Sequence, residues 1–504
     1  MRRAAALLLA LAAPAAAQET VTSPAPASVA VTVYRNPLPG GGRRFDLNWL
    51  NGFALIMETR TVRLPAGPAT LRFQGVADGI VPASAIVTGL PGGVVEKNRD
   101  ARLLSPAALI DGHLGRRVTL TRTDRASGRV RVQEAAIVAG PAGGVVVRTP
   151  DGVEALGCSG LAEKPGYAAV PAGLTAGPVL SVATVSPTPA TATVTLSYLT
   201  SEFDWSASYV ATIRPDGRSL DLFAWLTLAN GNAQAFPVAQ VQTVAGRLNR
   251  RDQRRFRVYA APLRLQCYPL GTTTSDLARK DAEDIVVTAR RFGAFEAAPP
   301  PPPPVAVPTP TAPPPPEDLG DLKLYRVPEL VTVNARGQKQ VALLARAGVP
   351  FQRVYRQTLP AAQPAPRSPT AVALRLDNRA AGALGSPLPA GTTTLYARRG
   401  GERLLLGTGA IGDKAVGETV RIGAGRSEQV QVSQTAPRRG EGAIEISNAN
   451  RFAVTAEIAI AAPPGNLAPN AALSVVDGLP TWVVTVPANG RRALAYRIRD
   501  AGGG

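Results

Sequence analysis

Histidine and cysteine are the scarcest chemically versatile residues here: the 504-residue chain has one histidine and two cysteines. These counts exclude a zinc site built from His and Cys ligands, which needs several of them. A Ser–His–Asp or Cys–His catalytic arrangement would have to use His113, which lies in Ile110-Asp111-Gly112-His113-Leu114-Gly115. That glycine-flanked stretch predicts a surface turn, so we expect no catalytic or metal site. No P-loop or dinucleotide fingerprint follows a predicted strand, and we expect no cofactor.

Aromatic residues and helical patterns are also scarce. Aromatics make up 5% of the chain, so hydrophobic cores must rely on valine, leucine and isoleucine. No long stretch repeats apolar residues with the 3.6-residue period of an amphipathic helix. Instead, short alternating stretches are separated by turns that use many of the 49 glycines and 47 prolines. This pattern predicts a mostly β fold of antiparallel β-sandwich domains, and the length predicts two or three domains.

Long apolar runs are absent, apart from one short run at the N-terminus. Arg2 and Arg3 precede the apolar residues 4–13, and the small residues 15–17 follow. This is the pattern of a signal peptide cleaved before Gln18, and the alternative is a buried N-terminal helix. The run is far shorter than the roughly 20 residues that cross a bilayer as a helix. We therefore expect an exported protein, periplasmic or associated with the outer membrane, without a transmembrane helix.

Acidic residues number 36 against 55 basic ones, which gives a formal net charge of +19. Such a surface can attract nucleic acid, anionic polysaccharide or lipopolysaccharide. However, the arginines are scattered along predicted strands and turns, and no nucleic-acid-binding motif is present. The densest group, residues 250–255, is expected to be a solvated loop. We therefore predict no nucleic-acid partner.

The clearest secondary structure lies between residues 192 and 230. Val194, Leu196 and Tyr198 alternate with polar residues, which places them on one face of a strand. The turn Pro215-Asp216-Gly217 follows a second strand, because proline fixes φ and glycine accepts a positive φ. The apolar face of the returning strand comprises Leu220, Leu222, Ala224, Leu226 and Leu228. This predicts a hairpin with one strongly apolar face.

Three of the aromatic residues before that turn are Tyr198, Trp205 and Tyr209. A strand ending in tyrosine, a small-residue-Trp-x-x-x-Tyr segment and then a long strand resemble the domain of unknown function 4139 family, also called mucoidy-inhibitor-A-like. The likeness is clearest over residues 192–230 and extends more weakly to Arg499. Its other parts are Leu324-Tyr325-Arg326-Val327-Pro328, Leu388-Pro389-Ala390-Gly391 and a hairpin over residues 442–460. The resemblance implies structural motif residues but no established chemistry, and the family's coiled-coil insertion is missing.

The chain divides into regions of different composition. We expect a signal peptide at residues 1–17 and an N-terminal β domain at 18–190. The second, mucoidy-inhibitor-A-like β domain is expected in two parts, 191–270 and 320–500. Between them, residues 271–319 are polar and rich in proline and predict an extended, poorly ordered insert.

Further strands are predicted from alternation at residues 29–34, 54–64, 70–73, 80–90, 117–123, 130–138, 144–149, 330–343, 482–486 and 491–498. Turns of the form Pro-Ala-(x)-Gly recur after Leu64, Val170, Leu388 and Val486. Proline presets such a turn and glycine relieves it. Those after Leu64 and Val486 predict hairpins between the strands that flank them.

The sharpest local motif lies inside the insert. After Glu283 come Asp284, Ile285, Val286, Val287, Thr288 and Ala289. This sequence resembles the TonB box, by which outer-membrane transporters engage the TonB energy transducer. Its β-favouring residues can add as a strand to the sheet edge of a partner, and the alternative is an ordinary short strand or an exposed loop. We therefore hypothesise that these residues bind a TonB-like envelope protein.

The two cysteines, Cys158 and Cys267, lie far apart in the sequence. In an oxidising compartment an isolated pair usually forms a disulfide, and the alternative is two separate buried thiols. Together with the other features, the sequence favours an exported, non-catalytic scaffold or binding protein that acts through sheet edges and loops. The alternative function is an envelope glycan hydrolase that uses carboxylates, because paired carboxylates are not recognisable from sequence alone.

Overall fold

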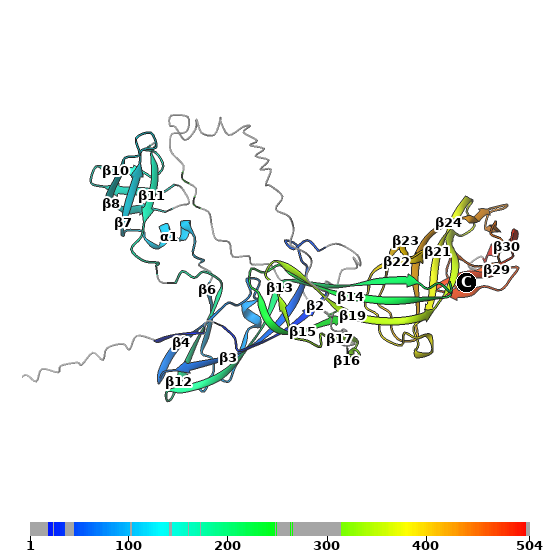
Figure 1. The fold of residues 1–504 in the computed structure, drawn as a ribbon, viewed down its shortest axis with the longest axis horizontal. Helices are drawn as coiled ribbons and strands as arrows, with labels where there is room; N and C mark the ends of the chain where they lie inside the picture. Colours follow the sequence, from blue (N-terminus) through cyan, green and yellow to red (C-terminus); the bar gives the residue numbers. More distant parts are fainter. Residues whose placement is uncertain are drawn as a thin grey trace, which may run out of the picture. The chain divides into compact units, whose positions relative to one another are not determined.

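The computed structural model describes residues 19–23, 25–35, 45–100, 103–140, 144–159, 161–171, 173–246, 248, 263, 265 and 314–499. Over these residues the protein is mostly β, as predicted (Figure 1). The chain splits into two compact units. Unit 1 comprises Met1–Val29, Met57–Thr200 and Gln253–Thr309, and unit 2 comprises Ala30–Ile56, Ser201–Asp252 and Pro310–Gly504. This division places Ala30–Ile56 with unit 2 and ends the segment Met57–Thr200 of unit 1 at Thr200, whereas the sequence led us to expect a boundary at residue 190.

Unit 1 contains a four-stranded sheet with the order β1–β4–β12–β6. Its strands are β1 (Glu19–Ser23), β4 (Gly67–Gln74), β6 (Glu96–Asp100) and β12 (Val179–Ser186). In β4 the alternation places Ala69, Leu71 and Phe73 in the core. Strand β12 pairs antiparallel with β4 and β6, whereas β1 runs parallel to β4. The short strand β5 (Ile86–Thr88) pairs with the unit 1 part of β13 (Ala190–Ile213).

A five-stranded antiparallel sheet, with the order β10–β9–β8–β7–β11, forms the other part of unit 1. Its strands are β7 (Arg117–Thr123), β8 (Val130–Ala139), β9 (Val146–Thr149), β10 (Gly152–Ala155) and β11 (Ala162–Gly166). The helix α1 (Pro106–Gly112) starts at Ser105, whose Oγ accepts a hydrogen bond from the Ala108 amide at 3.1 Å. The helix buries Ile110 in a core with side chains of this sheet, including Leu120 and Ile137.

The first sheet of unit 2 follows the order β16–β17–β15–β2–β3–β13–β14–β19. Strand β18 also pairs with β15, and β22 pairs in parallel with β13 and antiparallel with β23. The bounds are β2 (Ser28–Tyr34), β3 (Gly52–Leu64), β14 (Ser219–Asn230), β15 (Phe236–Ala245), β16 (Glu317–Leu319), β17 (Leu322–Arg326), β18 (Val331–Val333), β19 (Gly337–Pro350), β22 (Gly391–Arg399) and β23 (Glu402–Ile411). Figure 1 shows the paired strands β14 and β19 side by side.

The second sheet of unit 2 has the order β27–β30–β25–β24–β21–β20–β26–β29–β28. Its strands are β20 (Gln352–Pro360), β21 (Ala365–Asp377), β24 (Thr419–Thr435), β25 (Glu441–Asn448), β26 (Val454–Ala461), β27 (Leu467–Pro469), β28 (Ser474–Val476), β29 (Leu479–Val486) and β30 (Gly490–Ile498). The two ends of this sheet form two arms, one with β25 and β30 and the other with β26 and β29. One hydrophobic core contains Ile446 and Leu494 from the first arm and Ile458 and Trp482 from the second. The sheet therefore folds over itself in the manner of a sandwich.

The predicted hairpin at the centre of the sequence is confirmed. Strands β13 and β14 pair antiparallel from Phe203 with Asn230 to Ile213 with Leu220. Leu222, Leu226 and Leu228 are buried, and Gly217 lies in the turn with a φ of 67°. The alternation of the sequence thus assigned the inward face of β14 correctly.

The two sheets of unit 2 contain the same arrangement of seven strands. In the first repeat the neighbours run β18–β15–β2–β3–β13–β14–β19, and in the second repeat they run β29–β26–β20–β21–β24–β25–β30. In each repeat the first strand of the chain pairs in parallel with the fifth, β2 with β15 and β20 with β26. Because chain order and sheet order both correspond, unit 2 contains an internal structural duplication.

An equivalent asparagine ends the fourth strand of each repeat. Asn230 Nδ2 donates to the carbonyls of Gln234 at 2.9 Å and Asn334 at 3.0 Å. Asn448 Nδ2 makes the equivalent bonds to Phe452 at 2.8 Å and Pro487 at 2.9 Å. In each case the Oδ1 accepts the backbone amide two residues later. These side chains satisfy partly buried carbonyls where the chain leaves one strand for another.

The last strand of each repeat also begins in the same way. The sequences Val331-Thr332-Val333-Asn334-Ala335-Arg336-Gly337 and Val484-Thr485-Val486-Pro487-Ala488-Asn489-Gly490 share Val-Thr-Val-x-Ala-x-Gly. Arg336 and Asn489 have positive φ values of 45° and 49°. Their amides donate to the carbonyls of Asn232 and Asn450, each at 3.0 Å. The duplication is therefore visible in sequence, backbone conformation and hydrogen bonding.

Several predicted hairpins are wrong because their strands do not pair. Around the turn at Pro65-Ala66-Gly67, β3 and β4 belong to different sheets. The terminal strands β29 and β30, and likewise β25 and β26, lie in different arms of the second sheet. The flanking turns therefore carry the chain from one sheet or arm to another.

Two other expectations need correction. Only Ile86–Thr88 of the strand expected at residues 80–90 is a strand, and Pro82–Ser84 forms a 3₁₀ turn instead. The region predicted as a poorly ordered insert ends earlier than residue 319, because Glu317–Leu319 pairs with β17. Glu317 and Arg326 also form an ion pair at 2.6 Å across these strands.

Candidate functional site

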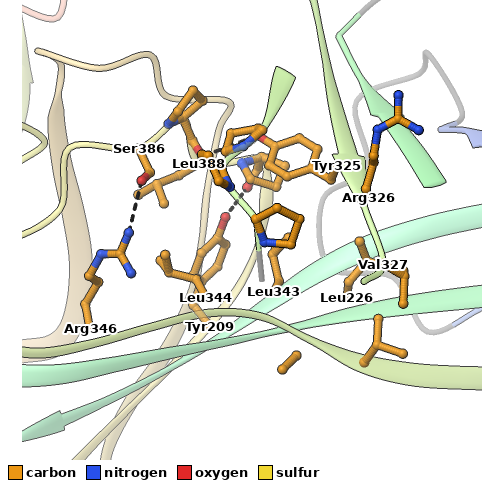
Figure 2. Close-up of a pocket in the computed structure, with 17 residues that line it drawn as sticks. Tyr209, Leu226, Tyr325, Arg326, Val327, Leu343, Leu344, Arg346, Ser386 and Leu388 are labelled. Carbon is orange, nitrogen blue, oxygen red and sulfur yellow. Dashed lines mark hydrogen bonds between the residues drawn. The ribbon is translucent and has the colours of Figure 1, made fainter. Parts of the chain in front are cut away.

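A small cavity in unit 2 brings together three segments that carried the family resemblance (Figure 2). Its floor comes from Tyr209 on β13, Leu226 on β14 and Leu344 on β19. Tyr325 on β17 and the loop from Ser386 to Pro389 form its walls. These segments lie far apart in the sequence, and the pairing of β13, β14 and β19 places them around one space.

Hydrogen bonds from the two tyrosines hold the proline-rich loop in place. Tyr209 Oη donates to the Pro389 carbonyl at 2.6 Å, and Tyr325 Oη donates to the Pro387 carbonyl at 3.3 Å. Arg346 reaches the same loop and donates to Ser386 Oγ at 3.2 Å, as Figure 2 shows. Burial raises the pKa of both tyrosines, so their hydroxyls stay protonated and remain donors.

The size and lining of the cavity indicate what it can hold. Its volume is about 240 Å³, below the roughly 300–1,000 Å³ of typical small-molecule sites. Pro314, Pro315 and Pro316, at the end of the proline-rich tract, also line it. Tyrosine-lined grooves suit extended proline-rich segments. The cavity is therefore smaller than a typical small-molecule site and is bordered by tyrosine and proline residues.

Trp205, the second motif residue, anchors a neighbouring cluster. Its indole Nε1 donates to the Val244 carbonyl at 3.1 Å, and Arg35 lies over its ring at 5.5 Å. Arg35 also forms an ion pair with Asp413 at 2.7 Å. Asp413 Oδ1 in turn accepts the Ala390 amide at 2.8 Å. Trp205 thus contributes to holding the end of the loop that bears Pro389.

Tyr198, the first motif residue, lies in unit 1 in a buried polar network. Its hydroxyl donates to Glu58 Oε1 at 3.0 Å, while Arg60 binds Glu58 Oε2 at 2.6 Å. Arg60 and Glu58 are 0% and 1% exposed in their side chains. Burial raises the pKa of Glu58, although Arg60 and Tyr198 oppose this effect. All three groups serve to stabilise one another inside the fold.

The sequence held an overlooked signal for this network. Ile56, Glu58, Arg60 and Val62 share the inward face of β3, so two opposite charges at alternate positions interrupt an apolar face. Such a pattern predicts a buried ion pair. The remaining donors of Arg60 bind the carbonyls of Ser23 and Gln74, each at 2.8 Å.

A second buried carboxylate, Glu457 on β26, lies in unit 2. It contacts Arg356 at 3.0 Å, Arg375 at 3.1 Å and Arg421 at 3.6 Å. Arg356 and Arg421 also bind Asp477 at 2.7 and 2.9 Å. Burial alone would raise the pKa of Asp477, but these arginines outweigh burial and hold its pKa below the ordinary value. This network joins β20, β21, β24 and β26 through their side chains.

His113 is buried and not in the predicted surface turn, which corrects that expectation. It caps the C-terminus of α1 and is 6% exposed. Its Nδ1 donates to the Leu109 carbonyl at 2.8 Å, and its ring lies tilted against the Tyr167 ring, with 4.7 Å between the ring centroids. The helix, which turn reasoning missed, creates this position. The described contacts of His113 are those of a structural residue.

The remaining predicted site residues fall largely outside the described part of the chain. Asp284, Ile285, Val286, Val287, Thr288 and Ala289 all lie outside it. Cys267 also lies outside it, whereas Cys158 follows β10 and is not a free thiol. Leu265 packs against Gly157: a Cβ added to Gly157 would lie 3.1 Å from the Cβ of Leu265. The bridge stays a prediction, although the neighbours of the two cysteines are close together.

Among the described residues, no group of three or more His, Cys, Asp or Glu side chains is arranged to hold a metal ion. None of the described helices has the length and apolarity to cross a membrane. No family model matches the chain, and no curated protein matches it. The resemblance drawn from Tyr198, Trp205 and Tyr209 therefore stays a hypothesis.

Proposed function

We propose that the protein is an exported, non-catalytic binding protein of the cell envelope, in which the duplicated β-sandwich is a scaffold for partner-binding inserts. The duplication in unit 2 carries this proposal. In both repeats the additional chain enters at the same two connections, between the second and third strands and between the fifth and sixth. Scaffolds commonly bear their binding segments on such connections.

The inserts differ greatly between the repeats. Between β3 and β13 the first repeat carries most of unit 1, whereas the second carries the β22–β23 hairpin between β21 and β24. Between β15 and β18 the first repeat carries the proline-rich tract and the TonB-box-like residues 284–289 in addition to the short strands β16 and β17. The proposed partner-binding segment therefore belongs to a connection that the second repeat fills with only two short strands, β27 and β28.

The buried ionisable groups support a scaffold role. Glu58 and Glu457 both accept hydrogen bonds from arginines and sit inside the fold. A general acid or base must instead reach a substrate proton. In this proposal these carboxylates stabilise the sheets, and partner binding is left to the inserts.

The partner proposal is tested with a peptide of residues 281–293. We expect it to bind the periplasmic domain of a TonB-type transducer weakly, because ordering a free strand costs entropy. Replacing Val286 by proline removes a backbone N–H that strand addition needs. NMR titration should show chemical-shift changes with the parent peptide and none with Val286→Pro. Equal changes from both peptides, or none from either, would reduce the motif to a chance match.

Export is tested separately. The mature protein should begin at Gln18 and be recovered from the periplasm or outer membrane, as N-terminal sequencing can establish. An oxidising compartment should also leave Cys158 and Cys267 bridged. Thiol titration of the denatured protein without reductant should then find no free thiol, and two free thiols would refute the bridge.

A further inference from the structure

The hairpin β22–β23 of unit 2 presents an unusual combination of apolar and basic side chains. Its two strands pair from Gly391 with Ile411 to Arg399 with Glu402. Gly400 and Gly401 close the loop with φ values of 56° and 86°, as a two-residue hairpin turn requires. Strand β22 is fixed along most of its length, because Gly391–Ala397 pair in parallel with Ala207–Ile213 of β13.

Three consecutive leucines near the tip are exposed. Leu404, Leu405 and Leu406 are 46%, 59% and 41% exposed. Single apolar residues on a surface are ordinary, but a contiguous exposed group marks an interaction site. Consecutive residues of a strand point to opposite sides, so the exposed leucines make both sides of the hairpin apolar.

Basic side chains surround these leucines. Arg398 and Arg403 occupy directly opposite positions on the two strands, and Arg399 lies opposite Glu402. Like charges in directly opposed positions destabilise a hairpin. Arg403 also lies over the Tyr396 ring, with 5.5 Å between its Cζ and the ring centroid. An anionic partner would relieve the repulsion between Arg398 and Arg403.

The edge of β23 is poorly suited to a partner strand. Leu395 pairs with Gly407 and Tyr396 pairs with Leu405, so Leu406 is an extra, bulged residue. Bulges and basic residues on an edge strand disfavour the addition of another strand. The apolar and basic tip suits a lipid surface better, where leucines enter the acyl boundary and arginines meet phosphates.

We propose that the β22–β23 hairpin docks on an anionic phospholipid surface. Leu404, Leu405 and Leu406 enter the interface, and Arg398, Arg399 and Arg403 bind the lipid phosphates. The formal net charge of +19 favours approach to such a surface. This interaction is independent of the proposed TonB-type partner, because it uses residues of another connection.

The test is sedimentation of the mature chain, residues 18–504, with phosphatidylcholine vesicles that contain or lack phosphatidylglycerol. We expect binding to the anionic vesicles that weakens as salt is raised. Changing Arg398, Arg399 and Arg403 to glutamine should lower affinity on the order of 100-fold, from about fivefold for each arginine near an anionic membrane. Changing the three leucines to serine should lower it by about tenfold or more.

Two control variants distinguish binding by this hairpin from binding through the overall positive charge or through exposed apolar side chains elsewhere. Arg438 and Arg439 are an exposed pair at the β24–β25 turn. Changing both to glutamine should lower the affinity for anionic vesicles only slightly, because salt screens charges that lie away from the lipid surface. Val130 and Val132 are 60% and 61% exposed in unit 1, and their change to serine should leave binding unchanged.

Thermal unfolding should show that all four variants remain folded. The proposal is overturned if the parent does not prefer anionic vesicles, or if the hairpin variants bind as the parent does. It is equally overturned if the control changes lower affinity as much as the hairpin changes, because binding would then follow total charge or total exposed apolar surface.

Discussion

The first and second repeats of unit 2 share a strand order but differ in what their connections carry. The shared parts are the sheet order, the parallel pairs β2–β15 and β20–β26, and the asparagines that end β14 and β25. The differing parts are the inserts, which range from a hairpin to most of unit 1. The comparison indicates that the shared strand order and the hydrogen bonds to backbone carbonyls at the strand ends define this fold. The length and content of the connections are free to vary.

The largest expected effect tests whether the two cores contribute equally. Counting back from Asn230 and Asn448 makes Leu226 and Ile444 equivalent, and both are buried. Replacing either by alanine removes apolar contacts and leaves a cavity, which typically costs about 2–5 kcal/mol. Urea unfolding should show a lower midpoint for each variant. An unchanged midpoint for Leu226→Ala would mean that the inward face of β14 is assigned wrongly.

The asparagines provide the sharpest test of the duplication itself. Asn230→Ala removes the donor to two partly buried carbonyls, and Asn448→Ala removes the donor to the two equivalent carbonyls and a longer bond to Val486 at 3.4 Å. Because water can reach partly exposed carbonyls, each change should cost about 1–3 kcal/mol in total. We expect similar losses in the two repeats. Asn450→Ala is the control, because it removes only a donor to Asn448 Oδ1 at 2.9 Å. A large loss in one repeat and none in the other would show that the bonds are not equivalent.

The ion pairs of Glu457 should stabilise the second repeat in a way that has no counterpart in the first. Strand β26 carries Glu457, whereas the corresponding strand β15 carries no charged residue. Glu457→Gln leaves three arginines without their shared carboxylate, and we expect a loss of about 2 kcal/mol, below the range for fully buried pairs because the arginines are partly exposed. The depressed pKa of Asp477 means that its contribution is present at neutral pH and lost as pH falls through that pKa.

The stability lost in Glu457→Gln is measured as the difference in unfolding midpoint between this variant and the parent at neutral pH. Arg491→Gln is a suitable control, because Arg491 and Glu445 are both exposed and such pairs contribute little. A midpoint for Glu457→Gln no lower than that of the control would remove the network from the account of stability.

The smallest effect concerns the turns between the third and fourth strands. In the first repeat Asp216 accepts the amides of Arg218 and Ser219 at 2.9 and 3.0 Å, and the Ser219 hydroxyl also bonds to it. The serine hydroxyl and these amides lower the pKa of Asp216 to about 2. The second repeat has Arg438 and Arg439 in the corresponding turn and no carboxylate.

Because the folded-state pKa of Asp216 is depressed, its contribution is complete above the unfolded value near 3.9 and is lost as pH falls toward about 2. Asp216→Asn should therefore lower the unfolding midpoint slightly at pH 6 and not at all below pH 2. NMR titration of the Asp216 carboxyl provides the direct measurement. A midpoint of titration near 4 would contradict the hydrogen bonds to this carboxylate.

Part of the candidate site was accessible from sequence. The aromatic positions Trp205 and Tyr209 were singled out, and the side chain of each is buried and donates one hydrogen bond to a backbone carbonyl. Tyr325 and the Leu388–Pro389 loop were noted separately, but nothing local could show that they meet around one cavity. The pair Glu58 and Arg60 was visible as charges on an apolar face and was missed.

The sequence by itself determined which residues form strands and which face inward, because a period of two and the turn chemistry of proline and glycine act over a few residues. Only the tertiary structure decided which strands pair. At Pro65-Ala66-Gly67 and Pro487-Ala488-Asn489-Gly490 the turn is present, yet the strands on either side lie in different sheets or arms. A local turn lowers the cost of reversing the chain, whereas the choice between pairing and crossing depends on which distant apolar faces are buried together.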